Sequence, residues 1–131
     1  MVTAIIHKDR YATALSNERH AWTADEPTVV GGQDTGPNPF DYLLAALASC
    51  IAITLRMYAD RKEWPVHSIK VSVSMDTRKD NGQTETTFFK NIVIEGDIDD
   101  GQRARMMDIA AKCPVHRVLT GRIAMAEDLP L

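Results

Sequence analysis

A long uncharged segment near the middle of the chain constrains its fold more than any other feature. Residues 42–55 (YLLAALASCIAITL) contain no charged side chain. Just before them, Asn38 suits a helix N-cap, Pro39 suits the first helical position, and Asp41 suits the first turn, where the helix dipole favours an acid. Pro65 disfavours helical geometry at the residue before it. The sequence therefore predicts one long helix, and its first half is apolar all round, so we expect burial on several faces.

The segments before this helix are typical of short strands. Three runs rich in Thr, Ile, Ala and aromatic residues are separated by turn-forming residues, and a loop dense in Gly and Pro follows them. The pattern predicts a meander with strands at Thr3–Lys8, Tyr11–Leu15 and Arg19–Ala24.

The segments after the helix predict a hairpin and two further helices. Apolar residues alternate with polar ones from Ile69 to Asp76, and Asn81-Gly82 is a strong hairpin turn signal. The expected later elements are a strand from Thr84 to Glu95, a helix at Gly101–Lys112, a short helix from Pro114 and a strand near Arg122–Ala126. The order of elements predicts a single α+β domain over residues 1–131.

Composition narrows the class of protein. The chain has 131 residues, 44% of them hydrophobic and 25% charged, as in ordinary globular proteins. A net charge of −3 argues against nucleic acid as a partner, because phosphate binding needs a basic surface. The N-terminus lacks the pattern of a secretory signal, and the uncharged segment is shorter than the ~20 residues of a membrane span. We therefore expect a cytoplasmic protein with no membrane partner and with cysteines outside permanent disulfides.

The two cysteines lie in different local contexts. Cys113 precedes a proline that can start a helix, and Lys112, His116 and Arg117 lie nearby; these features favour a thiolate. A Cys-Pro pair at a helix start also occurs for structural reasons, so both interpretations of Cys113 stay open. Cys50 has no charged residue within one helical turn, and its local sequence favours a structural role.

The sequence gives little support for a metal site, a phosphate-binding loop or a hydrolase site. The 4 histidines and 2 cysteines show no CxxC or HxxxH spacing, whereas a closed zinc site needs four ligands. No glycine-rich phosphate loop or nucleophile elbow is present. We expect neither a metal nor a cofactor.

Two longer motifs resemble a known family. The segments GPNPFDYLLAALASC (36–50) and CPVHRVL (113–119) are similar to the OsmC/Ohr family of osmotically induced and organic hydroperoxide resistance proteins. The resemblance covers nearly the whole chain in the order of its elements. It implies an OsmC-like fold with antiparallel sheets around a long central buried helix, and an intertwined homodimer with active sites at the subunit interface. The pairs that resemble a less characterised OsmC-like branch are Arg19-His20 and His116-Arg117.

The resemblance also implies a chemistry for the two cysteines. By similarity the protein is a thiol-dependent peroxidase that reduces organic hydroperoxides. Cys50 would attack the peroxide and become a sulfenic acid, and Cys113 would resolve it to a disulfide. An external dithiol would then reduce this disulfide, and lipoyl-type reductants serve in the hydroperoxide-resistance branch.

The sequence departs from the characterised peroxidases at two places. In those enzymes a glutamate directly follows the Asn-Pro pair, whereas this chain has Phe40, and the nearest acid is Asp41, turned by about 100° around the helix. The activating arginine of the family lies in the N-terminal meander, where Arg10 and Arg19 are the candidates. An alternative function is therefore a non-catalytic binding or thiol-sensing module with an interface pocket. A different cysteine chemistry on an acyl or electrophilic substrate is a third.

Overall fold

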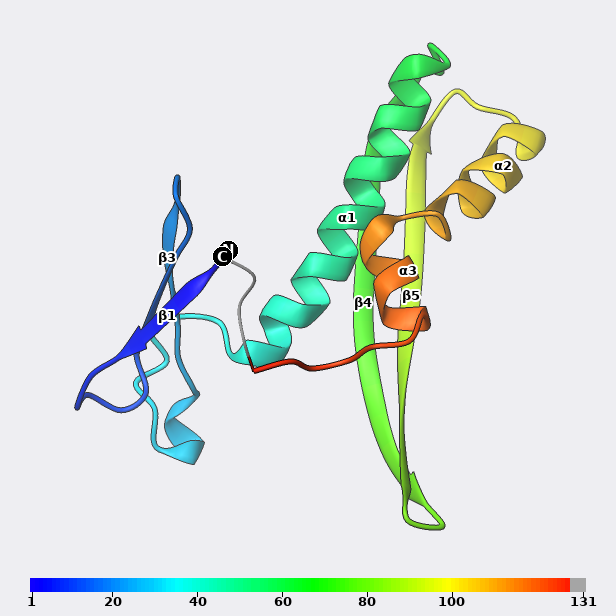
Figure 1. The fold of residues 1–131 in the computed structure, drawn as a ribbon. Helices are drawn as coiled ribbons and strands as arrows, with labels where there is room; N and C mark the ends of the chain where they lie inside the picture. The colour runs from blue at the N-terminus through cyan, green and yellow to red at the C-terminus, as the bar shows by residue number, and fades with distance from the viewer. Residues whose placement is uncertain (128–131) are drawn as a thin grey trace. The chain divides into compact units, whose positions relative to one another are not determined.

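In a computed structural model, residues 1–127 of the chain are described (Figure 1). They form two compact units, the first over Met1–Leu44 and the second beginning at Ala45. The helix α1 (Pro39–Arg61) starts in the first unit and continues into the second. That the two units make one domain stays a prediction.

The first unit contains the predicted meander. Strands β1 (Thr3–Ile6), β2 (Thr13–Ser16) and β3 (Ala21–Ala24) form an antiparallel sheet in that order. The side chain of Asn17 closes the β2–β3 turn, because its Oδ1 accepts hydrogen bonds from the N–H groups of Arg19 and His20.

A buried aspartate organises the loop between β3 and α1, which includes the 3-10 turn η1 (Thr28–Val30). Asp25 is 2% exposed. Its Oδ1 accepts from the N–H groups of Tyr11 and Glu26, and its Oδ2 accepts from the N–H group of Gln33 and from both the N–H and hydroxyl groups of Thr35. The Thr35 hydroxyl, aided by these N–H groups, outweighs burial and holds the pKa of Asp25 well below its ordinary value.

The long helix α1 begins and ends as its sequence predicts. Asn38 and Asp41 cap its start reciprocally: Asp41 N–H donates to Asn38 Oδ1 at 3.0 Å, and Asn38 N–H donates to Asp41 Oδ2 at 3.2 Å. Beyond its last residue, Glu63 takes a left-handed conformation with φ 55°.

The second unit is a long hairpin with helices packed on one face (Figure 1). Strands β4 (Val66–Asp80) and β5 (Gln83–Gly96) pair antiparallel around Asn81-Gly82, whose φ angles are 48° and 80°. Positive φ at both central residues is the geometry that Asn-Gly supplies in a two-residue turn. The core between hairpin and helices contains Leu47, Ile51, Leu55, Val66, Ile94, Met106 and Cys113.

Two shorter helices complete this core. Helix α2 (Asp100–Ala110) starts with a capping box between Asp99 and Gln102. Helix α3 (Pro114–Thr120) starts directly after Cys113. Residues 122–126 form no strand, so that expectation is wrong; no other strand of the described chain pairs with them to supply a hydrogen-bond ladder.

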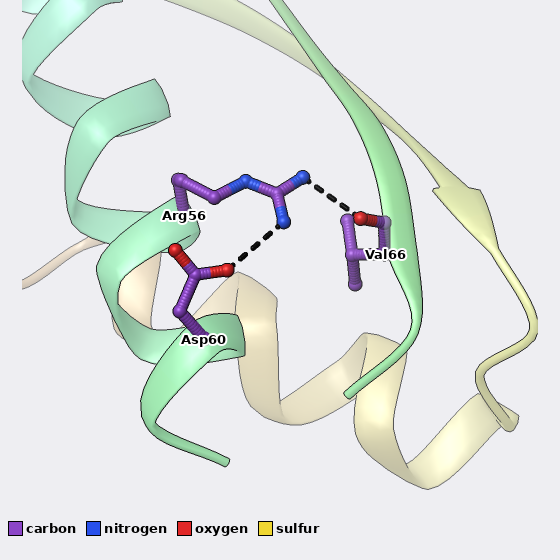
Figure 2. Close-up of polar contacts among 3 residues, drawn as sticks. All are labelled: Arg56, Asp60 and Val66. Carbon is purple, nitrogen blue, oxygen red and sulfur yellow. Dashed lines mark hydrogen bonds and ion pairs between the residues drawn. The ribbon is translucent and has the colours of Figure 1, made fainter. Parts of the chain in front are cut away.

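Polar contacts hold the open end of the hairpin, where β4 starts and β5 ends, against the helices. Figure 2 shows Arg56 of α1, whose Nη2 donates to the carbonyl oxygen of Val66 at 2.9 Å while Nη1 pairs with Asp60 at 3.1 Å. Arg103 of α2 donates to the carbonyl oxygens of Ile94 and Gly96 on β5.

The α+β class with antiparallel sheets and a long helix is therefore confirmed. Burial of α1 follows one stripe, however, and Ile53 and Met57 are 58% and 67% exposed. By length and composition α1 is also apolar enough to cross a membrane, a test that the core helix of a soluble protein passes as well. Its packing against β4, β5 and α2 is that of a core helix.

Candidate functional site

The second unit brings the two cysteines together. Cys50 lies on α1 and Cys113 is the N-cap residue of α3. Both are free thiols; Cys50 packs against the core that contains Cys113, and its nearby sulfur raises the pKa of the Cys113 thiol. We call this pair the dithiol site. Residues separated by half of the chain thus come together in one site, because α3 packs on the hairpin face that α1 also covers.

Cys113 is the more enclosed of the two sulfurs. It is 0% exposed, whereas Cys50 is half-buried. Burial raises the pKa of the Cys113 thiol, and the neighbouring Cys50 raises it further. The N–H groups of Val115 and His116 lower this pKa, but by less than burial raises it, and the Cys113 side chain makes no cap hydrogen bond.

The local features that favour a thiolate at Cys113 are therefore outweighed by burial, which raises the pKa of this thiol. Its neighbours Lys112 and Arg117 are exposed, so solvent screens their charges. The order of roles that the resemblance implies, with Cys50 attacking and Cys113 resolving, stays a prediction.

The remaining predicted site residues lie in the first unit. Asp41 is engaged in the cap of α1, with both its carboxylate and its N–H group bonded to Asn38. The side chain of Phe40 beside it is 62% exposed. Arg10 lies in the turn between β1 and β2, and the N–H group of Arg19 bonds to Asn17. Whether Arg10, Arg19 or Asp41 reaches Cys50 stays a prediction.

One pair of residues near the dithiol site is not evident from local sequence. Lys90 of β5 places its Nζ 3.4 Å from Nδ1 of His116 on α3. Burial, and then the Lys90 charge, lower the pKa of His116. The alternation along β5 could have signalled Lys90, since it occupies an inward position between two apolar residues, Phe88 and Ile92.

Metal binding finds no support in the described residues. Within residues 1–127 no group of three or more His, Cys, Asp or Glu side chains is arranged to hold a metal ion.

Comparisons with known proteins place this arrangement in a family. The sequence model described as "OsmC-like protein" matches residues 32–127. No functionally curated protein matches the chain. Among solved structures, an OsmC-like protein from Mycoplasma pneumoniae is 21% identical with a TM-score of 0.78, and the match covers 92% of this chain and 86% of that one.

Two organic hydroperoxide resistance proteins share the fold as well. The protein from Legionella pneumophila is 14% identical with a TM-score of 0.68, and 92% of this chain and 88% of that chain are covered. The protein from Elizabethkingia anophelis is 17% identical with a TM-score of 0.69, and the match covers 92% of this chain and 86% of that chain. These likenesses show the fold. Because the family model spans most of the sequence, and both motif cysteines lie within it, the chain belongs to the OsmC-like protein family.

Proposed function

We propose that the protein is a thiol-dependent peroxidase that reduces organic hydroperoxides at the Cys50/Cys113 pair. The observation that carries the proposal is the packing of Cys50 against the core that encloses Cys113, with both thiols free. Family membership, and the fold shared with organic hydroperoxide resistance proteins, support it.

The proposed cycle begins at Cys50. Its thiolate attacks the terminal peroxide oxygen, an S–O bond forms as the O–O bond breaks, and the alcohol leaves with a proton. Cys50 is then a sulfenic acid. Cys113 loses its proton and attacks the Cys50 sulfur, which forms the disulfide and releases water. An external dithiol, of the lipoyl type by family resemblance, reduces the disulfide by thiol exchange.

The enclosure of Cys113 has a use in this cycle. A protonated buried thiol does not compete with Cys50 for peroxide, because the thiolate is the nucleophile. Its place near Cys50 holds the resolving sulfur close to the sulfenic acid when it forms. Rapid resolution protects Cys50 from further oxidation, which is irreversible.

We also propose that the protein acts as a homodimer in the cytoplasm. On α1, Ile53 and Met57 follow Cys50 at i+3 and i+7 and are exposed. On the outer face of β5, Phe89 and Val93 are 52% and 43% exposed. A second copy covering this apolar surface would place Cys50 beside an interface, as the family resemblance implies.

One specific observation favours a second function. Asp41, the nearest acid to the family's glutamate position, is held in the helix cap, and Phe40 offers no charge. Phe40 in place of the family's acid fits a module that senses oxidants or binds ligands without turnover.

Turnover separates the two functions. Peroxide consumption is measured with cumene hydroperoxide and dihydrolipoamide for the wild type, Cys50→Ser and Cys113→Ser. The peroxidase predicts multiple turnovers in the wild type, none in Cys50→Ser, and in Cys113→Ser a sulfenic acid that dimedone traps. A single rapid oxidation without turnover would favour the sensor, and full turnover in Cys50→Ser would overturn both.

A further inference from the structure

The inner face of β5 carries an unexpected charge. Phe88, Ile92 and Ile94 point toward the helices and pack on the core that contains the dithiol site. Lys90 lies in the same row, because side chains two residues apart share one face of a strand. Its partner across the hairpin is Val73, which also packs on this core. The Lys90 side chain is itself exposed, so its ammonium group is open to an anion from solvent.

Within residues 1–127, Lys90 has no carboxylate partner. The ion pairs there join Arg56 to Asp60, Arg78 to Asp76 and Arg105 to Asp108. The contact of Lys90 is instead His116, which is half-buried on α3. An ammonium group donates only, so Nδ1 of His116 accepts this hydrogen bond and the neutral ring carries its proton on Nε2.

The pair therefore presents one positive charge and several hydrogen-bond donors. Burial and the Lys90 charge both favour the neutral form of His116, so Lys90 supplies the charge. The Nζ–H groups of Lys90 and the Nε2–H group of His116 are donors to an anion that bridges them. A carboxylate, with two acceptor oxygens, matches such a pair.

The pair is also next to the dithiol site. His116 is the third residue of α3, and Cys113 is its N-cap residue, so the two side chains start from the same turn. The N–H group of His116 is one of the groups that lower the pKa of Cys113. Phe88 and Ile92, on either side of Lys90, pack on the core to which Cys113 belongs.

We propose that Lys90 and His116 recognise the carboxylate of a small molecule that reacts at the dithiol site. The inference rests on the proposed function and deepens it, because it names the chemistry of the ligand. The carboxylate belongs either to the hydroperoxide substrate or to the thiol reductant. In both cases the anion is held at the first turn of α3 while the reactive group reaches Cys50 or the Cys50–Cys113 disulfide.

Matched pairs of ligands test this recognition. In the substrate arm, linoleic acid hydroperoxide is compared with its methyl ester. In the reductant arm, dihydrolipoate is compared with neutral dihydrolipoamide. We expect the acid-to-neutral ratio of kcat/KM to fall about tenfold in Lys90→Met in one of the two arms, as the loss of a charge-assisted contact predicts. The affected arm identifies the source of the carboxylate.

Two variants control for charge and folding. Lys90→Arg keeps the charge and should retain most of the ratio. Lys70→Met removes a lysine from the opposite face of the same hairpin and should leave the ratio unchanged. Methionine suits the apolar row at position 90, so the fold should tolerate that change. An unaltered ratio in both arms of Lys90→Met would overturn the proposal.

A binding measurement keeps this inference separate from the peroxidase function. Octanoate and methyl octanoate are titrated into reduced Cys50→Ser protein while the His116 imidazole signals are followed by NMR. We expect octanoate alone to shift these signals, and Lys90→Met in the same background to abolish the shift. If octanoate binds in this way but the wild type shows no turnover, the carboxylate site is supported and the peroxidase function is refuted. Equal behaviour of acid and ester would refute the site whatever the turnover.

Discussion

Cys50 packs against the core that encloses Cys113, and its sulfur raises the pKa of the Cys113 thiol. Cys113 is fully enclosed by the core between the hairpin and the helices, while Cys50 is half-buried on α1. Burial and the neighbouring Cys50 both raise the pKa of Cys113. This asymmetry supports the proposal that Cys50 attacks the peroxide and Cys113 resolves the sulfenic acid.

Removal of Cys50 should make Cys113 easier to ionise. In Cys50→Ala the neighbouring sulfur that raises the pKa of Cys113 is lost, but burial remains. We therefore expect this pKa to fall while staying above that of an ordinary thiol. The pH dependence of Cys113 alkylation, followed by mass spectrometry, measures the change against the wild type. An unchanged profile would show that the two thiols are not coupled.

Acid should destabilise the first unit through Asp25. The folded pKa of Asp25 lies below its unfolded value of about 3.9, so its carboxylate stabilises the fold above that value. This contribution is lost as pH falls below about 4 toward the folded pKa. We expect Asp25→Asn to have a lower urea midpoint than the wild type at pH 7. The difference should shrink as the pH is lowered below 4, and a constant difference would contradict this role.

Arg103 should stabilise the packing of α2 on β5. Its guanidinium donates to the carbonyl oxygens of Ile94 and Gly96, and Arg103→Met leaves both without that donor. Charge-assisted hydrogen bonds of this kind predict a loss of about 1–3 kcal/mol in the free energy of unfolding. Arg78→Met is the matched control, since its ion pair with Asp76 is exposed and should contribute less than about 1 kcal/mol. Urea unfolding of both variants decides the comparison.

Charged substitutions on the exposed side of α1, at Ile53 and Met57, should weaken self-association. Ile53→Asp and Met57→Asp each place a carboxylate on side chains that are exposed in the single chain. A solvated surface would tolerate them, whereas a dimer interface would bury an unpaired charge, and we expect a shift toward monomer. Light scattering over a concentration series measures the shift, with exposed Lys112→Glu as control. A wild-type protein that is monomeric at every concentration would refute the dimer.

Truncating an inward residue of α1 should destabilise the protein much more than truncating an outward residue of the same helix. Ile51 is fully buried and Ile53 is exposed. We expect Ile51→Ala to cost about 2–5 kcal/mol of unfolding free energy through the lost contacts and the cavity. Ile53→Ala should change the stability of the isolated chain by less than about 0.5 kcal/mol. Equal losses would indicate that Ile53 is buried in solution.

Much of the fold could be predicted because local signals agree with one another. Asn38 and Asp41 do cap the long helix, Asn81-Gly82 does close a hairpin, and Pro114 does start a short helix. Each depends on residues within one turn of the chain. The strand expected near Arg122–Ala126 is absent, because a strand needs a neighbour that local sequence does not supply.

By itself, then, the sequence determined the order of the elements, the ends of α1 and the two motif cysteines. Only the tertiary structure decided that the pKa of Cys113 is raised, because the hairpin and helices enclose this thiol and bring Cys50 near it. The same packing turned Lys90 toward His116. Burial and through-space contact govern both outcomes, and these depend on residues far apart in the chain.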